Sequence, residues 1–356
     1  MKQIFEETKL GKLTIKNRLV RSATFENGCG DYGHIKSELE KVYHQLAEGG
    51  VGLIITGMMS AAHNAGVSDN MIKIYEDSFV NDFAPIVDAI HNCDGKIVVQ
   101  LGHCGAKASV IDKGEYAFAP SDIELGGKTA KEMTKKQIND LVKEYGISAR
   151  KCKEAGADGV QIHGGHGYLV SEFLSPYFNH RTDEYGGNIE NRARLLFEIY
   201  DEIRSQVGTE YPILIKINYS DLVEGGNTGV ETSYVCKELE KREIDAIELT
   251  SGISVNPESA PTQPGRKEEG FFTEGALDIA GQITTAVISV GGYRSLDKIK
   301  ETLNAGNIEA ISICRPLICE PDLPRKWQNG DTDKAICVSC SQCFGMPVHG
   351  CKVFGA

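Results

Sequence analysis

The sequence has no long apolar run, and this absence argues against a membrane-spanning helix. No stretch of about 18 consecutive apolar residues occurs in the chain, although a membrane-spanning helix needs about that many. The opening residues MKQIFEETKLGKL are charged and lack the apolar centre of a secretory signal peptide. We therefore expect a cytoplasmic protein with no membrane partner.

Positive charge is also scarce. The 356 residues include 50 acidic and 38 basic side chains, which give a formal net charge of −12. A surface of this sign repels nucleic acid and acidic membranes, so we expect no nucleic-acid partner. The overall charge is still compatible with a local basic pocket for one phosphate group.

A dinucleotide-binding motif is missing too, because no G-x-G-x-x-G follows the first predicted strand. Short apolar runs rich in β-branched residues alternate instead with amphipathic, helix-like segments. Such runs are typical of parallel strands that are covered on both faces. The alternation predicts an α/β protein with a (β/α)8 barrel, and a doubly wound sheet is the alternative. The predicted strands cover residues 19–23, 51–56, 96–101, 159–163, 212–218, 246–249, 286–290 and 310–314.

Further segments complete this prediction. Residues 5–17 contain Leu-Gly-Lys-Leu and predict a short β-hairpin before the first barrel strand. Residues from about 106 to 133 form a long, Gly-rich connection, which is typical of an active-site loop. We expect residues 1–330 to form the barrel and residues 331–356 to form a cysteine-rich tail that packs on it.

Polar residues collect where the predicted strands end, and in a barrel these ends converge on one face. Gly291 and Gly292 follow the seventh strand, and Cys314 and Arg315 follow the eighth. Glycine lets backbone N–H groups approach an anion and Arg adds charge, so this pair of turns predicts a phosphate site. A tight loop with a surface arginine is the alternative.

Two more polar residues belong to the same ring of strand ends. Lys216 interrupts an apolar strand, and its charge needs a negative partner if it is buried. That partner is either a carboxylate in a structural salt bridge or an anionic ligand. Together with Gln100 and the phosphate site, Lys216 favours FMN as the ligand.

Two histidines and a tyrosine follow the fourth strand in the stretch VQIHGGHGYLVSEF (160–173). His163 and His166 are candidates for metal ligands or for core residues. Their third interpretation is a pair of N–H donors that hold a carbonyl oxygen, beside Tyr168 as a proton donor. That set suits the reduction of a C=C bond conjugated to a carbonyl, with hydride passing from flavin N5 to the β-carbon and a proton from Tyr168 to the α-carbon.

The stretch HGGHGYLVSEFLSPYFNHRTDEYGGNIENRARL (163–195) closely resembles the signature of the Old Yellow Enzyme family. The likeness extends to KNRLVRSA, GGVGLIITG, VVQLGHCGAKA, GGYRS and CRPL, and it covers most of the chain. It implies an FMN-dependent NAD(P)H oxidoreductase on a (β/α)8 barrel. Family members often carry Arg where this chain has Lys216, and Lys keeps the charge without the planar fork.

The resemblance also implies roles for matching residues. It assigns the substrate carbonyl to the two histidines and the proton to Tyr168. The residues that it places against the flavin ring or phosphate, together with those already chosen from the strand ends, are Ala23, Thr24, Gly57, Gln100, Lys216, Gly291, Gly292, Cys314 and Arg315.

Four of the eleven cysteines lie in the last twenty residues, in the order Cys337-x2-Cys340-x2-Cys343-x7-Cys351. Clustered thiols in a reducing compartment indicate metal more than disulfides. The order is similar to the [4Fe–4S] site of the larger family members, dienoyl-CoA reductases and trimethylamine dehydrogenase. A four-cysteine zinc site and free thiols are the alternatives.

Three functional hypotheses follow. The first is an ene-reductase in which NAD(P)H reduces FMN and the flavin reduces an α,β-unsaturated carbonyl compound. The second is an FMN/iron–sulfur subunit that works with a separate flavoprotein as its electron-transfer partner. The third, a metal-dependent hydrolase, lacks further His and Asp ligands at other strand ends. The sequence leaves open a homo-oligomer and the choice between NADH and NADPH.

Overall fold

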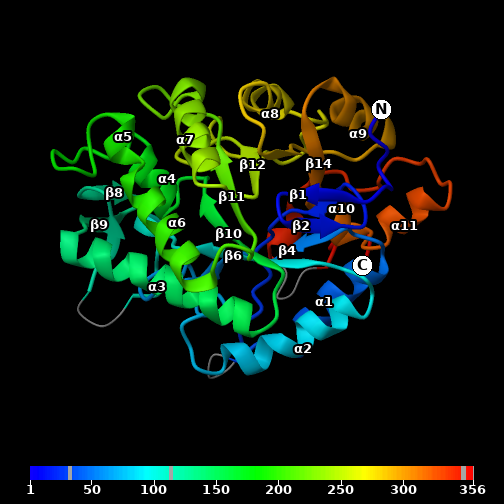
Figure 1. Ribbon diagram of the computed structural model, residues 1–356, viewed down its shortest axis with the longest axis horizontal. Helices are drawn as coiled ribbons and strands as arrows, with labels where there is room; N and C mark the ends of the chain where they lie inside the picture. Colours follow the sequence, from blue (N-terminus) through cyan, green and yellow to red (C-terminus); the bar gives the residue numbers. More distant parts are fainter. Residues whose placement is uncertain (31–33, 112–114, 346–349, 356) are drawn as a thin grey trace.

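Eight parallel strands close into a barrel at the centre of the computed structural model (Figure 1). Each barrel strand pairs with the next one along the chain, and the last pairs with the first. The predicted (β/α)8 barrel is therefore confirmed. The strands are β3 (Leu19–Arg21), β4 (Leu53–Ile55), β6 (Ile97–Gly102), β10 (Gly159–Gly164), β11 (Ile213–Asn218), β12 (Ala246–Thr250), β13 (Ala286–Val290) and β14 (Ile308–Ile313).

Helices surround the barrel (Figure 1) and cover the outer face of the strands. In α6 the buried positions Leu195, Leu196, Ile199 and Ile203 recur with the predicted helical period. The longer helices are α1 (Ser37–Glu48), α2 (Phe79–His91), α3 (Lys135–Glu154), α6 (Arg194–Val207), α7 (Gly229–Lys241), α8 (Thr273–Ala280) and α9 (Leu296–Ala305). The shorter ones are η2 (Gly105–Lys107), α4 (Leu169–Leu174), α5 (Ile189–Arg192), α10 (Arg315–Cys319), α11 (Leu323–Gln328) and η3 (Gln342–Gly345).

The predicted N-terminal hairpin closes one end of the barrel. Strands β1 (Thr8–Leu10) and β2 (Leu13–Ile15) pair antiparallel around a turn in which Gly11 has φ +60°. A side chain at Gly11 would collide with Asp245, so glycine is required there for space as well as for backbone conformation. The apolar hairpin residues pack against inward-facing residues near the starts of the barrel strands. Active sites of this fold lie at the opposite, C-terminal end.

The connection predicted as a loop from about 106 to 133 carries more structure than expected. It contains a small sheet of β7 (Ala117–Ala119), β8 (Ile123–Leu125) and β9 (Lys128–Glu132). A further short strand, β5 (Met59–Ser60), pairs with the end of β6. These strands follow the C-terminal ends of β4 and β6, and they form part of one wall above the barrel mouth.

The structure describes residues 1–30, 34–111, 115–345 and 350–355. Within these ranges no helix combines the length and apolar character needed to cross a membrane. The tail leaves α11 and returns to the barrel, where Ala335 is buried and its N–H donates to the carbonyl of Arg294 at 2.9 Å. The division at residue 331 into a barrel and a cysteine-rich tail stays a prediction.

Candidate active site

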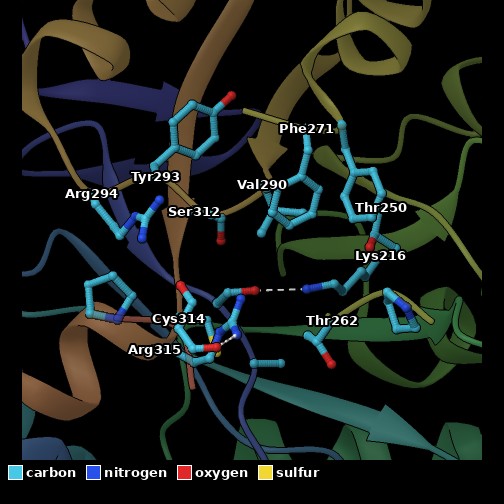
Figure 2. A pocket seen from close by; sticks show the side chains of 18 of the residues that line it. Lys216, Thr250, Thr262, Phe271, Val290, Tyr293, Arg294, Ser312, Cys314 and Arg315 are labelled. Carbon is cyan, nitrogen blue, oxygen red and sulfur yellow. Dashed lines mark hydrogen bonds between the residues drawn. The ribbon is translucent and has the colours of Figure 1, made fainter. Parts of the chain in front are cut away.

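A cavity opens at the C-terminal end of the barrel (Figure 2). Its walls come from the ends of β3, β11, β12, β13 and β14 and from the loops that follow them. The strand ends converge here because the eight strands are parallel, as the sequence predicted. The candidate residues that line this cavity are Ala23, His166, Lys216, Gly291, Gly292, Cys314 and Arg315.

One side of the cavity is prepared for an anion. Gly291 and Gly292 have φ of 149° and 76°, so the backbone after β13 follows a path that other residues rarely adopt. The buried Arg294 Nε and Ser312 Oγ have no hydrogen-bond partner in the described part of the chain. Figure 2 shows both side chains on the same side of the cavity. Buried donors without partners are costly, and a phosphate group would satisfy both.

Arg315 has partners within the protein in addition to its predicted phosphate contact, which stays a prediction. It lines the cavity, but its Nη1 donates to the Ser339 carbonyl at 3.0 Å and to Ser341 Oγ at 3.1 Å. The predicted phosphate arginine is therefore also bonded to the cysteine-rich tail. Sequence reasoning missed Arg294 of the GGYRS segment, whose Nε offers the donor that Arg315 was expected to supply.

Lys216 forms the structural ion pair that was the alternative to a ligand contact. Its Nζ lies 3.0 Å from Glu248 Oε1 and donates to Ser22 Oγ at 2.8 Å. Burial by itself would raise the pKa of Glu248, but Lys216, Ser22 and Gln161 hold that pKa below its usual value. Because Lys216 also lines the cavity, it presents its positive charge to both Glu248 and any ligand.

Gln100 lies in the layer beneath the cavity, outside its lining. Its amide donates to Gln161 Oε1 at 2.7 Å, and Gln161 in turn donates to Glu248 Oε2 at 3.0 Å. Sequence reasoning missed both Gln161 and Glu248. They carry the same signal that identified Lys216, a polar residue inside an otherwise apolar strand.

Two other predicted flavin contacts also lie outside the cavity lining. The Gly57 amide donates to Glu26 Oε2 at 2.9 Å. The Thr24 hydroxyl accepts a hydrogen bond from Arg21 and lies 3.1 Å from the Cys314 sulfur. These groups stabilise the loops around the site, and their predicted contact with a flavin stays a prediction.

The two histidines and the tyrosine lie together above β10. His163 is the penultimate residue of β10, and its ring centroid lies 5.2 Å from that of His166 and 5.1 Å from that of Tyr168. The chain reaches this arrangement by a tight turn in which His166 and Gly167 have φ of 62° and 66°. A positive φ at a non-glycine residue is uncommon in proteins overall. The residues that do adopt it are often found at functional sites.

Both imidazoles are neutral. Burial, with smaller contributions from Lys216 and Lys107, lowers the pKa of His163 to about 3, and burial lowers the pKa of His166 well below its usual value. The Gly165 N–H donates to His163 Nδ1 at 3.3 Å, which leaves the ring proton on Nε2. Burial raises the pKa of Tyr168, so its phenol is protonated across the physiological range.

Lys107 holds this turn in place, and sequence reasoning missed it. Its Nζ donates to the His166 carbonyl at 2.7 Å and to the Ile253 carbonyl at 2.9 Å. The same ammonium group lies 5.1 Å from the centroid of the Tyr168 ring. Lys107 therefore ties the turn after β10 to the loop after β12 and contacts the candidate proton donor.

The four cysteines of the tail gather around a second, smaller cavity that Arg315 also lines. The lining includes all four of the predicted ligands, Cys337, Cys340, Cys343 and Cys351. Within the described residues, however, no three His, Cys, Asp or Glu side chains converge so that they could hold a metal ion. The cysteines are thus brought to one place, and the metal remains a prediction.

Comparison with known proteins establishes the family. Residues 3–334 match the NADH:flavin oxidoreductase / NADH oxidase family. An NADH oxidase of Thermoanaerobacter brockii is 31% identical over 96% of this chain and 53% of the relative. An NADPH dehydrogenase of Halalkalibacterium halodurans is 33% identical over 91% of this chain and 93% of the relative. The chain belongs to this family of flavin oxidoreductases, and it spans about half the length of the NADH oxidase.

Solved structures agree with this assignment. A 2-naphthoyl-CoA reductase in complex with 2-naphthoyl-CoA superimposes with a TM-score of 0.89 at 26% identity, over 96% of this chain and 54% of that protein. An Old Yellow Enzyme homologue from Zymomonas mobilis gives a TM-score of 0.81 at 25% identity, over 95% and 96% of the two chains. The resemblance to the Old Yellow Enzyme family is confirmed.

Proposed function

We propose that this NAD(P)H-dependent flavin oxidoreductase is an ene-reductase, which reduces the C=C bond of α,β-unsaturated carbonyl compounds. The observation that carries the proposal is the grouping of two neutral imidazoles and a protonated phenol at the barrel mouth, where His163 contacts both His166 and Tyr168. N–H donors bind a carbonyl oxygen, and a neutral phenol holds a transferable proton. The structural neighbour named 2-naphthoyl-CoA reductase acts on an aromatic acyl thioester, which supports a conjugated carbonyl substrate.

The cavity fits FMN by its chemistry. Arg294 Nε and Ser312 Oγ, which have no hydrogen-bond partner among the described residues, line the cavity together with the Gly291–Gly292 turn, where the phosphate would lie. Lys216 supplies positive charge at a different part of the lining, where it would face the flavin ring. When bound, FMN supplies the hydride for the β-carbon of the substrate.

The residues above β10 perform the remaining steps. Neutral His163 and His166 donate hydrogen bonds to the substrate carbonyl and stabilise the negative charge that develops on its oxygen. Tyr168 transfers its proton to the α-carbon and then recovers one from solvent. Lys107 keeps the turn and the phenol in position during both events.

The test is product formation in the absence of oxygen. The FMN-loaded chain is mixed with NADH or NADPH and an enal such as cinnamaldehyde, and the products are identified by mass spectrometry. We expect the saturated aldehyde in an amount equal to the NAD(P)H consumed. Consumption of NAD(P)H only when oxygen is admitted, with the enal unchanged, would reject the ene-reductase.

The cysteine-lined cavity favours a second candidate, an FMN/iron–sulfur subunit that exchanges electrons with a separate flavoprotein. All four candidate cysteines line this cavity, and their order along the chain is similar to the [4Fe–4S] site of the larger family members. Iron, zinc and sulfide analysis of anaerobically purified protein distinguishes the candidates. About four iron and four sulfide per chain would support the subunit, whereas one zinc or no metal would remove its main support.

A further inference from the structure

Arg315 forms a wall shared by two cavities. It lines the large cavity at the barrel mouth, and it also lines the small cavity that holds the four tail cysteines. It begins α10, directly after β14 and Cys314, and it is buried. Arg315 is therefore common to the candidate FMN site and the cysteine cluster, so a displacement of its side chain changes the lining of both cavities.

The tail itself contributes to the larger cavity. Ser339, which lies between Cys337 and Cys340, lines that cavity and is 3% exposed. Its carbonyl accepts hydrogen bonds from Arg315 Nη1 at 3.0 Å and from the Gly265 N–H at 2.8 Å. Ser339 also lies beyond residue 334, where the match to the family ends. This part of the wall is therefore built by a segment outside the family match.

A second set of contacts connects the tail to the loop after β13, which carries Gly291, Gly292 and Arg294. Lys334 pairs with Glu269, and Glu269 accepts hydrogen bonds from the backbone N–H groups of Arg294 at 2.7 Å and Ser295 at 2.9 Å. The Ala335 N–H in turn donates to the Arg294 carbonyl at 2.9 Å. The start of the tail thus fixes the loop after β13, and its cysteine-bearing part fixes Arg315 after β14.

The backbone of this segment needs external support. Ser339 and Ser341 both have left-handed conformations, with φ of 58° and 61°, although neither is glycine. Such conformations persist when surrounding contacts hold them. The neighbouring cysteines are the natural anchors, because Cys337, Cys340 and Cys343 alternate with these serines and all face the small cavity.

We infer that the cysteine-rich tail completes the phosphate end of the flavin site. The placement of its thiols around the small cavity then sets the affinity for FMN through Arg315 and Ser339. The inference rests on the proposed function in taking FMN as the ligand. Linkage is reciprocal, so bound FMN also stabilises the anchored state of the tail. We expect the coupling to act on phosphate binding, because Arg315 and Ser339 line the same cavity as Arg294 and Ser312, the donors assigned to the phosphate.

The test measures binding of two flavins to the full-length chain after its flavin has been removed. FMN and riboflavin are titrated by fluorescence, since riboflavin lacks the phosphate. A Cys340→Ser, Cys343→Ser double variant is compared with a Cys93→Ser control, whose thiol lies outside both cavities. We expect FMN to bind about tenfold more weakly to the double variant, as for loss of a charged hydrogen bond, with riboflavin affinity unchanged.

Equal FMN affinity in the double variant and the Cys93→Ser control would overturn the inference, and so would an equal loss for riboflavin. If the double variant does not fold, Ser341→Ala removes one acceptor of Arg315 and keeps every thiol. It should weaken FMN binding and spare riboflavin, and no change would again overturn the inference. Failure of the unaltered chain to bind any flavin would instead reject the proposed function.

Discussion

Single residues at the barrel mouth owe their chemistry to burial. His163, His166 and Tyr168 would all titrate nearer neutrality in water, and the fold shifts each of them toward its neutral form. Neutral groups suit the proposed reaction because they donate hydrogen bonds and a proton without adding charge to an apolar substrate site. The same burial of the histidines lowers the free energy of unfolding when the pH falls.

The stability of the protein should report this effect. The pKa of His163 is lowered to about 3, so below its unfolded pKa of about 6.5 the unfolded chain binds a proton that the folded chain does not. The free energy of unfolding therefore decreases as the pH falls from 6.5 toward 3. For each such histidine the slope approaches about 1.4 kcal/mol per pH unit.

A His163→Asn variant isolates this contribution. Urea unfolding between about pH 5.5 and 4 should show a pH slope that is shallower by about 1.4 kcal/mol per unit than that of the unaltered protein. Replacement of the exposed His180 by Asn is the matched control and should leave the slope unchanged. Parallel slopes for all three proteins would mean that His163 is not buried as a neutral group.

Some site residues could be chosen from the sequence and others could not. Lys216 and His163 stand out because a polar residue inside an otherwise apolar strand has few structural explanations, and Tyr168 follows the second of these strands closely. Gln161 and Glu248 show the same pattern and could have been found by the same rule. Lys107 and Ser339 could not, because their roles depend on contacts with segments that are remote in the chain.

At the scale of elements, the turn after β10 is held by its neighbours rather than by its own sequence. Lys107 reaches it from η2, and Asn218 at the end of β11 accepts a hydrogen bond from the His166 N–H at 3.1 Å. Thr250 at the end of β12 lies 2.9 Å from His166 Nε2. The left-handed backbone at His166 is thus maintained from three sides.

Loss of the Lys107 contacts should disturb proton transfer more than flavin reduction. In Lys107→Met we expect reoxidation of reduced flavin by an enal to slow by about 10- to 100-fold, since a small displacement of a catalytic group costs that much. Lys107→Arg keeps a charged donor and should recover part of the rate. Stopped-flow measurement of both half-reactions tests this prediction. An equal slowing of flavin reduction by NAD(P)H would contradict the proposal that Lys107 acts by positioning Tyr168.

The elements themselves were largely predictable. All eight barrel strands were located to within a few residues, because short continuous apolar runs are typical of parallel strands that are buried on both faces. The small sheet within residues 117–132 was missed. Its strand β9 reads Lys-Thr-Ala-Lys-Glu, mostly exposed and polar, so no hydrophobic pattern marks it.

At the scale of the whole molecule, stability and function lie at opposite ends of the barrel. The hairpin of β1 and β2 closes the base with apolar side chains, and the polar network and both cavities occupy the mouth. This division is general for the fold and lets the loops of the mouth vary without loss of the core.

Leu10→Ala tests that division. Leu10 is fully buried in the base of the barrel, so its truncation should lower the free energy of unfolding by about 2–5 kcal/mol. FMN affinity should stay unchanged, because the hairpin does not line either cavity at the mouth. Urea unfolding and flavin titration measure the two quantities, with Val230→Ala on the exposed face of α7 as the control. A large loss of FMN affinity in Leu10→Ala alone would show that base and mouth are coupled.

The measurement that tests the central claim most directly is a comparison of half-reactions in the unaltered protein and Tyr168→Phe, without oxygen. Flavin reduction by NAD(P)H should proceed at the same rate in both, because the phenol takes no part in it. Reoxidation by an enal should slow by about 10²- to 10⁴-fold in the variant, the usual contribution of a general acid. Equal rates of reoxidation in the two proteins, or equal losses in both half-reactions, would contradict the role of Tyr168 as the proton donor.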